Sequence, residues 1–302
     1  MFIHIHKVIR RLMSINNQAM RKSNGFLVIR ASYLDGITLE QYNYLFYLNS
    51  PTEMIYTYDA NRNLETIRGT NKPWFNQDFI YDPSNRLNDA VGAYGTYSYS
   101  YDNVGNRLTK TAYGQTEAYT YITGTNKIDE VTGPNQTIGY GYDNNGNITT
   151  VGDRTLIYNQ TNRLVRVEKD STVIGEYKYN GSGQRVKKTV DGATTIFHYD
   201  FDGKIIGESL TDGSFKKEYL YTSYTPKAMV DTTSGELYFF LNDYLGTPQM
   251  LVDSMNTIVW EATYKLFSEA FLNSKSLVED NFRVADHYYD KETGLHYNYF
   301  RY

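Results

Sequence analysis

The sequence contains no cysteine, which excludes a disulfide scaffold and any thiolate metal site. It leaves the cellular compartment open, because a large β protein outside the cell needs no disulfides. No run of about eighteen apolar residues occurs, so no membrane-spanning helix is predicted. Basic residues are not in excess either. The net charge of −4 and the pI near 5.8 exclude a generally basic protein that coats nucleic acid.

Tyrosine and glycine are plentiful instead. The 302 residues include 31 tyrosines and 23 glycines, and 40% of the chain is apolar, enough for one large core or two modest ones. Tyrosine prefers strands, where its ring lies on a pleated and half-buried face. The composition therefore favours β structure.

Residues 1–30 differ from the rest, because they are basic and contain no acidic residue. Five apolar side chains fall at helical spacing, and these are Ile5, Val8, Ile9, Leu12 and Ile15. One interpretation is an amphipathic targeting or membrane-surface helix. We favour the other, a loosely ordered chain end, because termini are commonly disordered. The start lacks a small-residue cleavage site and does not resemble a secretory signal.

From about residue 31 the chain repeats a short pattern, shown most clearly by YSYDNVGNRL at residues 99–108. One tyrosine of each copy stands in register, at spacings of 16 to 23 residues. These register tyrosines are Tyr58, Tyr81, Tyr101, Tyr121, Tyr142, Tyr158, Tyr179, Tyr199 and Tyr221.

Each copy predicts a β-hairpin. Aromatics two residues apart, such as Tyr99 and Tyr101, lie on one face of a strand. The following Asp bonds its own backbone and begins a turn, in which Gly105, Gly146 or Gly183 supplies a positive φ. About twenty residues hold two strands and two turns. The predicted fold class is all-β, a long antiparallel strip of β-hairpins.

Four later dipeptides fall about ten residues apart and predict type I′ hairpin turns. They are Asn180-Gly181, Asp191-Gly192, Asp202-Gly203 and Asp212-Gly213.

At these residues the chain resembles the YD-repeat family, which includes bacterial Rhs proteins, the BC components of insecticidal toxin complexes and the animal teneurins. The resemblance runs from about residue 40 to the end. The repeat motif is carried by Tyr58, Asp59, Tyr81, Asp82, Tyr101, Asp102, Gly105, Tyr142, Asp143, Gly146, Tyr179, Tyr199 and Asp200.

Residues 239–270 are similar to the Rhs-associated core, and residues 288–302 to its closing stretch. The core motif is carried by Asp243, Leu245, Gly246, Thr247, Pro248, Trp260 and Tyr264. Asn242 stands where His is usual, Leu266 where Pro is usual and Ser268 where Gly is usual. The resemblance divides the chain into a basic segment (1–30), a YD-repeat strip (31–235) and a truncated core segment (236–302).

The resemblance implies a structural shell that encloses a toxin or another polypeptide, with further shell chains as additional partners. It also implies a secreted or cell-surface protein. In relatives the core continues into a segment where aspartate-dependent self-cleavage releases a toxin. The sequence ends at Tyr302, before that segment. We therefore expect a gene fragment, a degenerate copy or one component of a split shell.

No residue pattern predicts catalysis, a cofactor or a metal site. The recurring aspartates sit at equivalent turns, so turn formation explains them better than acid–base chemistry. The five histidines lack zinc-site spacing, and we interpret His198 as structural. Asn242 to Pro248 is interpreted as a turn fixed by glycine and proline. The tyrosine stripe is expected to pack within the wall, and glycan or cell-surface binding by its aromatic surface is the alternative.

Overall fold

The computed structural model describes residues 28–29, 42–43, 54–69, 73–222, 225–243, 245–272, 274, 276–284 and 287–299. The chain forms two compact units, which we describe separately. Unit 1 comprises residues 1–51 and 195–289, and unit 2 comprises residues 52–194 and 290–302. Residues 5–15, for which the sequence allows an amphipathic helix and favours a loosely ordered chain end, lie outside the described residues. The three-part division drawn from the sequence stays a prediction.

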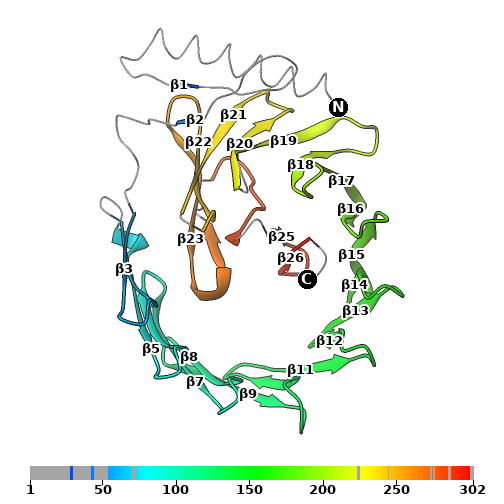
Figure 1. The fold of residues 1–302 in the computed structure, drawn as a ribbon. Coiled ribbons are helices and arrows are strands. Elements are labelled where there is room, and N and C mark those ends of the chain that lie inside the picture. The colour runs from blue at the N-terminus through cyan, green and yellow to red at the C-terminus, as the bar shows by residue number, and fades with distance from the viewer. Residues whose placement is uncertain are drawn as a thin grey trace. The chain divides into compact units, whose positions relative to one another are not determined.

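Unit 2 is a succession of antiparallel hairpins, in which each strand from β3 to β16 pairs with the next along the chain (Figure 1). The strands are β3 (Met54–Tyr58), β4 (Leu64–Gly69), β5 (Gln77–Tyr81), β6 (Leu87–Gly92), β7 (Gly95–Tyr101), β8 (Arg107–Ala112), β9 (Gln115–Tyr121), β10 (Ile128–Thr132), β11 (Thr137–Tyr142), β12 (Ile148–Val151), β13 (Arg154–Tyr158), β14 (Leu164–Lys169), β15 (Thr172–Tyr179) and β16 (Arg185–Val190).

Unit 1 continues the pattern, and each strand from β17 to β24 pairs antiparallel with the next. These strands are β17 (Ala193–Tyr199), β18 (Ile205–Ser209), β19 (Phe215–Thr222), β20 (Thr225–Asp231), β21 (Leu237–Asn242), β22 (Pro248–Val252), β23 (Ile258–Tyr264) and β24 (Ala270–Leu272). The short strands β1 (Val28–Ile29) and β2 (Tyr42–Asn43) also pair. Near the C-terminus lie β25 (Tyr288–Asp290) and β26 (Leu295–Tyr297).

The described residues contain two single-turn 3₁₀ helices, η1 (Pro73–Phe75) and η2 (Leu266–Ser268), and no α-helix. The predicted fold class, an all-β strip of antiparallel hairpins, is confirmed.

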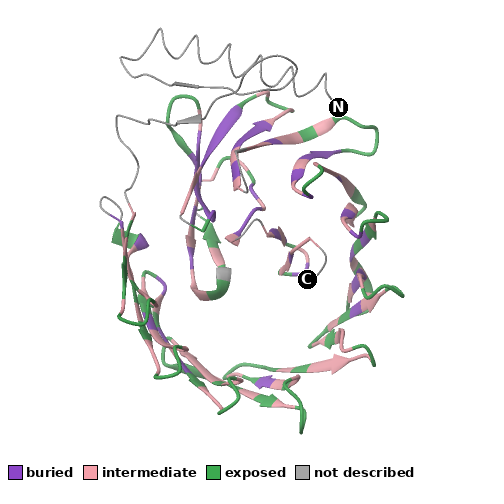
Figure 2. Ribbon diagram, viewed as in Figure 1, coloured by how far each residue is buried: buried purple, intermediate pink, exposed green. Residues whose placement is uncertain are grey.

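Burial alternates from residue to residue in strands such as β7, whereas β22 is buried at every residue; Figure 2 colours the ribbon by burial. In β7, Tyr97 and Tyr99 are each 4% exposed, whereas Ser98 and Ser100 between and after them are less buried. Ser100 Oγ and Thr109 Oγ1 lie 2.6 Å apart on the open face. One face of this hairpin is therefore aromatic and the other is lined by hydroxyls.

Small apolar clusters give each unit its core. In unit 2 the buried residues Leu156, Leu164, Val167 and Tyr177 form one cluster. In unit 1 a second cluster is built from buried residues of β20, β21 and β22, including Val230, and from partly buried neighbours. Aromatic packing adds to these clusters, because the rings of Tyr94 and Tyr97 meet edge to face at 5.5 Å.

One prediction about the turns is wrong. Of the four predicted dipeptides, only Asp191-Gly192 has positive φ at both residues (49° and 79°), as a type I′ turn requires. At residues 180–184 and 200–204, and at 210–214, the positive φ instead belongs to the fourth residue of the turn, Gly183, Gly203 or Gly213. The side chains of Asn180 and Asp200 accept hydrogen bonds from backbone N–H groups of the loops that follow them. These caps stabilise a longer loop in place of the two-residue type I′ turn that the dipeptides favour.

Candidate functional site

The Tyr-Asp turn is the element that the chain repeats, and Asp102 shows how it is built. Asp102 Oδ1 accepts hydrogen bonds from the backbone N–H of Val104 (3.0 Å) and of Asn106 (2.8 Å). The backbone N–H of Gly105 donates to the Asp102 carbonyl at 3.2 Å, and Gly105 has a φ of 96°. Only glycine adopts this φ without strain. The carboxylate therefore satisfies the loop's backbone groups from within.

The same geometry recurs at the other predicted aspartates. Each Oδ1 accepts backbone N–H donors two and four residues later, and these aspartates are Asp59, Asp82, Asp143 and Asp200. Gly146, with a φ of 86°, occupies the same position in its turn as Gly105. The side-chain amide of Asn147 lowers the pKa of Asp143, and that of Asn63 lowers the pKa of Asp59. Asp59 and Asp143 are therefore ionised structural caps at neutral pH.

The register tyrosines link each hairpin to the preceding one. The Tyr101 hydroxyl donates to the Leu87 carbonyl at 2.8 Å, and the Tyr142 hydroxyl donates to the Ile128 carbonyl at 2.9 Å. We call this series of hydroxyl–carbonyl bonds the tyrosine ladder. Its other members are Tyr81 to Leu64, Tyr121 to Arg107, Tyr179 to Leu164, Tyr221 to Ile205 and Tyr264 to Pro248.

Three register tyrosines remain. Tyr58, in the first described copy, is 50% exposed, and Tyr158 and Tyr199 are half-buried in β13 and β17.

Cations cover the rings of several ladder tyrosines. The Arg86 guanidinium lies 4.8 Å from the Tyr101 ring centre, and the Lys127 ammonium lies 5.1 Å from that of Tyr142. Such contacts each contribute about 0.5–1 kcal/mol at exposed sites. The ring face and the hydroxyl are therefore both engaged within the sheet.

The core motif proves to be another copy of the same turn. Asp243 Oδ1 accepts from the backbone N–H of Leu245 (2.9 Å) and Thr247 (2.8 Å), and Gly246 has a φ of 83°. Asn242 takes the place of the register tyrosine, because its side-chain amide donates to the Pro226 carbonyl at 3.0 Å. Burial raises the pKa of Asp243, whereas hydrogen bonds lower the pKa of the half-buried turn aspartates Asp59 and Asp143.

The other core residues surround this turn. Tyr264 and Trp260 are buried, and the Tyr264 hydroxyl reaches the Pro248 carbonyl at 2.7 Å. Leu245 is 54% exposed at the tip of the turn.

His198 lies on β17, where its Nε2 is 2.8 Å from the Ser209 hydroxyl, and burial lowers the pKa of His198.

Replacing Tyr101 with Phe should lower the free energy of unfolding by about 0.5–1.5 kcal/mol, because the ring stays while the ladder hydrogen bond is lost. Urea denaturation measures the change. Tyr113→Phe is the control, because Tyr113 is 66% exposed, and it should change stability by less than about 0.5 kcal/mol. Equal effects of the two substitutions would contradict a stabilising ladder.

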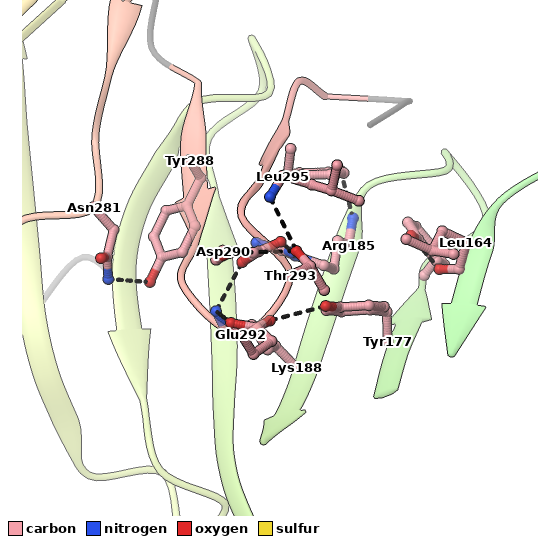
Figure 3. A network of polar contacts seen from close by, with 12 residues as sticks. Leu164, Tyr177, Arg185, Lys188, Asn281, Tyr288, Asp290, Glu292, Thr293 and Leu295 are labelled. Atoms are coloured by element: carbon pink, nitrogen blue, oxygen red, sulfur yellow. Dashed lines mark hydrogen bonds and ion pairs between the residues drawn. The ribbon is translucent and has the colours of Figure 1, made fainter. Parts of the chain in front are cut away.

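A polar network in unit 2, missed by the sequence analysis, holds the residues after β25 (Figure 3). Arg185 and Asp290, both fully buried, form an ion pair. Lys188 Nζ lies 2.7 Å from Asp290 Oδ1 and 3.0 Å from Glu292 Oε2. The Tyr177 hydroxyl donates to Glu292 Oε1 at 2.8 Å. We call residues 290–299 the closing segment.

The closing segment has further contacts on unit 2. The Arg185 backbone N–H donates to the Tyr297 hydroxyl at 2.7 Å, and the Arg185 guanidinium lies 4.4 Å from the Tyr297 ring centre. Arg154 donates to the Thr293 carbonyl, and Leu295 packs against the apolar cluster around Leu164. The segment is thus fixed to β13–β16 by charge, hydrogen bonds and apolar contact.

No group of three or more His, Asp or Glu side chains in the part of the chain that the structure describes could hold a metal ion. Nor does any helix among these residues have the length and apolarity needed to cross a membrane.

Comparison with known proteins places these features in a family. The model of the family described as Teneurin YD-shell matches residues 6–296. The tRNA3(Ser)-specific nuclease WapA of Bacillus spizizenii is 30% identical over 209 residues, 68% of this chain. The tRNA nuclease WapA of Bacillus subtilis (strain 168) is 31% identical over 209 residues. The chain spans 9% of the length of each of these relatives.

Solved structures show the same fold. The crystal structure of TcdB2-TccC3 without the hypervariable C-terminal region matches with a TM-score of 0.56 and 14% identity, over 83% of this chain and 16% of that chain. The complex TcdB2-TccC3-Cdc42 matches with a TM-score of 0.53 and 15% identity, over 82% of this chain and 16% of that chain. The chain therefore belongs to the Teneurin YD-shell family and is a structural shell module.

Proposed function

We propose that this chain forms part of the wall of a shell that encloses a polypeptide, and that a toxin is the guest. The tyrosine ladder is the observation that carries this proposal. Each hydroxyl joins one hairpin to the preceding hairpin, so the repeated side chains stabilise the sheet itself and do not converge on one small pocket. Hydrogen bonds that recur from hairpin to hairpin are suited to a continuous β-sheet wall.

The relatives support the choice of guest. The structures of similar fold are of TcdB2-TccC3 complexes, and the curated relatives are named as tRNA nucleases. This chain spans 16% of the former and 9% of the latter, so further shell chains or chain segments are proposed to complete the enclosure. Secretion or display at the cell surface is proposed on the same ground.

Protection of a fused polypeptide from protease tests enclosure. In a chimera in which the remaining shell segments of a WapA relative complete the enclosure, a destabilised reporter joined after Tyr302 should be digested at least tenfold more slowly than the same reporter joined to an open β-repeat protein. A triple variant, Tyr101→Phe, Tyr121→Phe and Tyr142→Phe, removes three hydrogen bonds of the tyrosine ladder and should lose part of the protection. Digestion at the rate of the free reporter would overturn the proposal.

We further propose that the chain performs no nuclease chemistry of its own. The turn aspartates cap backbone N–H groups and are engaged by their own loops. Purified protein incubated with tRNA and Mg²⁺ should therefore leave the RNA intact over hours, as followed on a denaturing gel. Cleavage that persists in protein purified under RNase-free conditions would show that the matched segment is itself catalytic.

Glycan binding through the aromatic surface is the weaker alternative. Stacking on a sugar needs an open ring face, and Arg86 and Lys127 lie over the rings of Tyr101 and Tyr142.

A further inference from the structure

Two copies in unit 2 depart from the repeat at the same two positions. Six and nine residues after the register tyrosine, the other copies of unit 2 with the same loop length carry apolar side chains, namely Leu64 and Ile67, Leu87 and Ala90, Ile148 and Val151, and Leu164 and Val167. The copy of Tyr101 has Arg107 and Lys110 there, and the copy of Tyr179 has Arg185 and Lys188. The two positions share a strand face because of a β-bulge: Arg107 pairs with Tyr101 and Lys110 pairs with Tyr99. Each copy therefore presents a pair of cations.

The second of these pairs shows what such cations bind. Arg185 and Lys188 together hold Asp290, and Lys188 also holds Glu292 (Figure 3). The Tyr177 hydroxyl, two residues before the register tyrosine, donates to Glu292. The ligand at this pair is an acidic segment with two carboxylates two residues apart.

The first pair has the same surroundings. The Arg107 guanidinium lies 4.9 Å from the ring centre of Tyr99, as that of Arg185 lies 5.3 Å from the ring centre of Tyr177. Tyr99 and Tyr177 occupy equivalent positions in their copies. A second ring also faces each arginine, and it belongs to Tyr119 at 5.5 Å for Arg107 and to Tyr297 at 4.4 Å for Arg185.

At the first pair, Glu117 has the contacts that Glu292, one of the two carboxylates of the closing segment, has at the second pair. Glu117 Oε2 lies 3.1 Å from Lys110 Nζ and accepts from the Tyr119 hydroxyl at 2.9 Å. Glu292 likewise receives a lysine and a tyrosine hydroxyl in the other copy. The side chains of Lys110 and Glu117 are 27% and 36% exposed, against 14% and 6% for Lys188 and Glu292. The Arg107–Lys110 pair is therefore the more accessible of the two.

We propose that Tyr99, Arg107 and Lys110 form a binding site for an acidic segment of the guest polypeptide. A guest carboxylate takes the place that Asp290 has beside Arg185 and Lys188, while Glu117 corresponds to Glu292. The identity of the guest rests on the proposed function. The site itself is inferred from its likeness to the arrangement of Tyr177, Arg185 and Lys188. An exposed ion pair such as Lys110–Glu117 contributes little, so it yields readily to a second carboxylate.

A synthetic peptide of residues 287–299, labelled with a fluorophore, is the probe, because it carries the carboxylate spacing of the closing segment. Titrated with the full chain, it should show saturable binding by fluorescence anisotropy. Glu117→Gln should tighten binding about two- to fivefold, since it removes a competing negative charge. A peptide with Asp290→Asn and Glu292→Gln should bind at least tenfold more weakly.

The deciding variant is Arg107→Leu with Lys110→Val, which installs the residue types found at these positions in the copy of Tyr158. Its fold is checked by circular dichroism, and binding of the peptide should fall at least tenfold. Unchanged binding would mean that the peptide enters the Arg185–Lys188 site and would overturn the proposal. So would a failure of Glu117→Gln to tighten binding, a result that does not depend on the double variant. Neither result bears on protection of the fused reporter, so the two proposals fail separately.

Discussion

Asp290→Ala should lower the free energy of unfolding by about 3–5 kcal/mol, one of the two largest effects expected in this protein. Arg185 and Asp290 are both fully buried, so the substitution leaves a desolvated guanidinium without this carboxylate. Lys188, which also contacts Asp290, keeps Glu292 as its partner. The loss should therefore arise mainly at Arg185.

Urea denaturation combined with hydrogen exchange measures this effect and locates it. Exchange should rise first in the closing segment and in β16, before the rest of unit 2. Glu65→Ala is the control, because Glu65 is exposed on β4, and its effect should stay within about 0.5 kcal/mol. A loss at Asp290 no larger than that of the control would mean that the buried pair does not hold the segment.

The hairpins could be predicted because their cause is local and repeated. Tyr-Asp followed by Gly, as in Tyr101, Asp102 and Gly105, specifies a strand end, a cap and a left-handed residue within five positions. The pattern recurs in nine copies, which all predict a hairpin. The turn type was harder to predict, because the side-chain cap of Asn180 or Asp200 competes with the preference of the dipeptide that follows it.

The tyrosine ladder and the polar network could not be read in the same way. A hydroxyl bond such as Tyr101 to Leu87 depends on how neighbouring hairpins pack, which no single copy encodes. Arg185 and Asp290 lie 105 residues apart, and no local pattern joins them. A signal was nevertheless present, because Arg185 and Lys188 replace apolar residues of the repeat. Cations at positions where other copies of unit 2 carry apolar residues indicate an acidic partner, which for Arg185 and Lys188 is the closing segment.

Asn242 illustrates the opposite case. The sequence marks it as a departure from the core motif, yet its side-chain amide performs the role of the register tyrosine by donating to the Pro226 carbonyl. The core motif is thus continuous with the repeats in structure, although its sequence is distinct. A change of residue that preserves a donor at the same place leaves the architecture intact.

Asp280→Asn should stabilise the protein at pH 8 by about 2–4 kcal/mol, with the gain disappearing toward pH 4. Asp280 is 1% exposed, its Oδ2 has no hydrogen-bond partner among the described residues, and burial raises its pKa to about 7. Arg283 and Lys217 favour the ionised form and Glu208 opposes it, but desolvation dominates. At pH 8 the native state therefore holds a buried charge that the amide avoids.

The sign follows from proton linkage. Because the folded pKa of Asp280 lies above its ordinary value of 3.8, the native state binds more protons than the unfolded state between about pH 4 and 7. The contribution of Asp280 to stability is therefore full below about pH 4 and is lost as the pH rises to about 7. Urea denaturation of wild type and Asp280→Asn across pH 4 to 8 measures the difference.

Asp143→Asn is the matched control of opposite sign, because hydrogen bonds lower the pKa of Asp143. The stability lost in Asp143→Asn should appear at neutral pH and vanish in acid. A difference between wild type and Asp280→Asn that does not change with pH would show that Asp280 keeps its ordinary pKa in the folded protein.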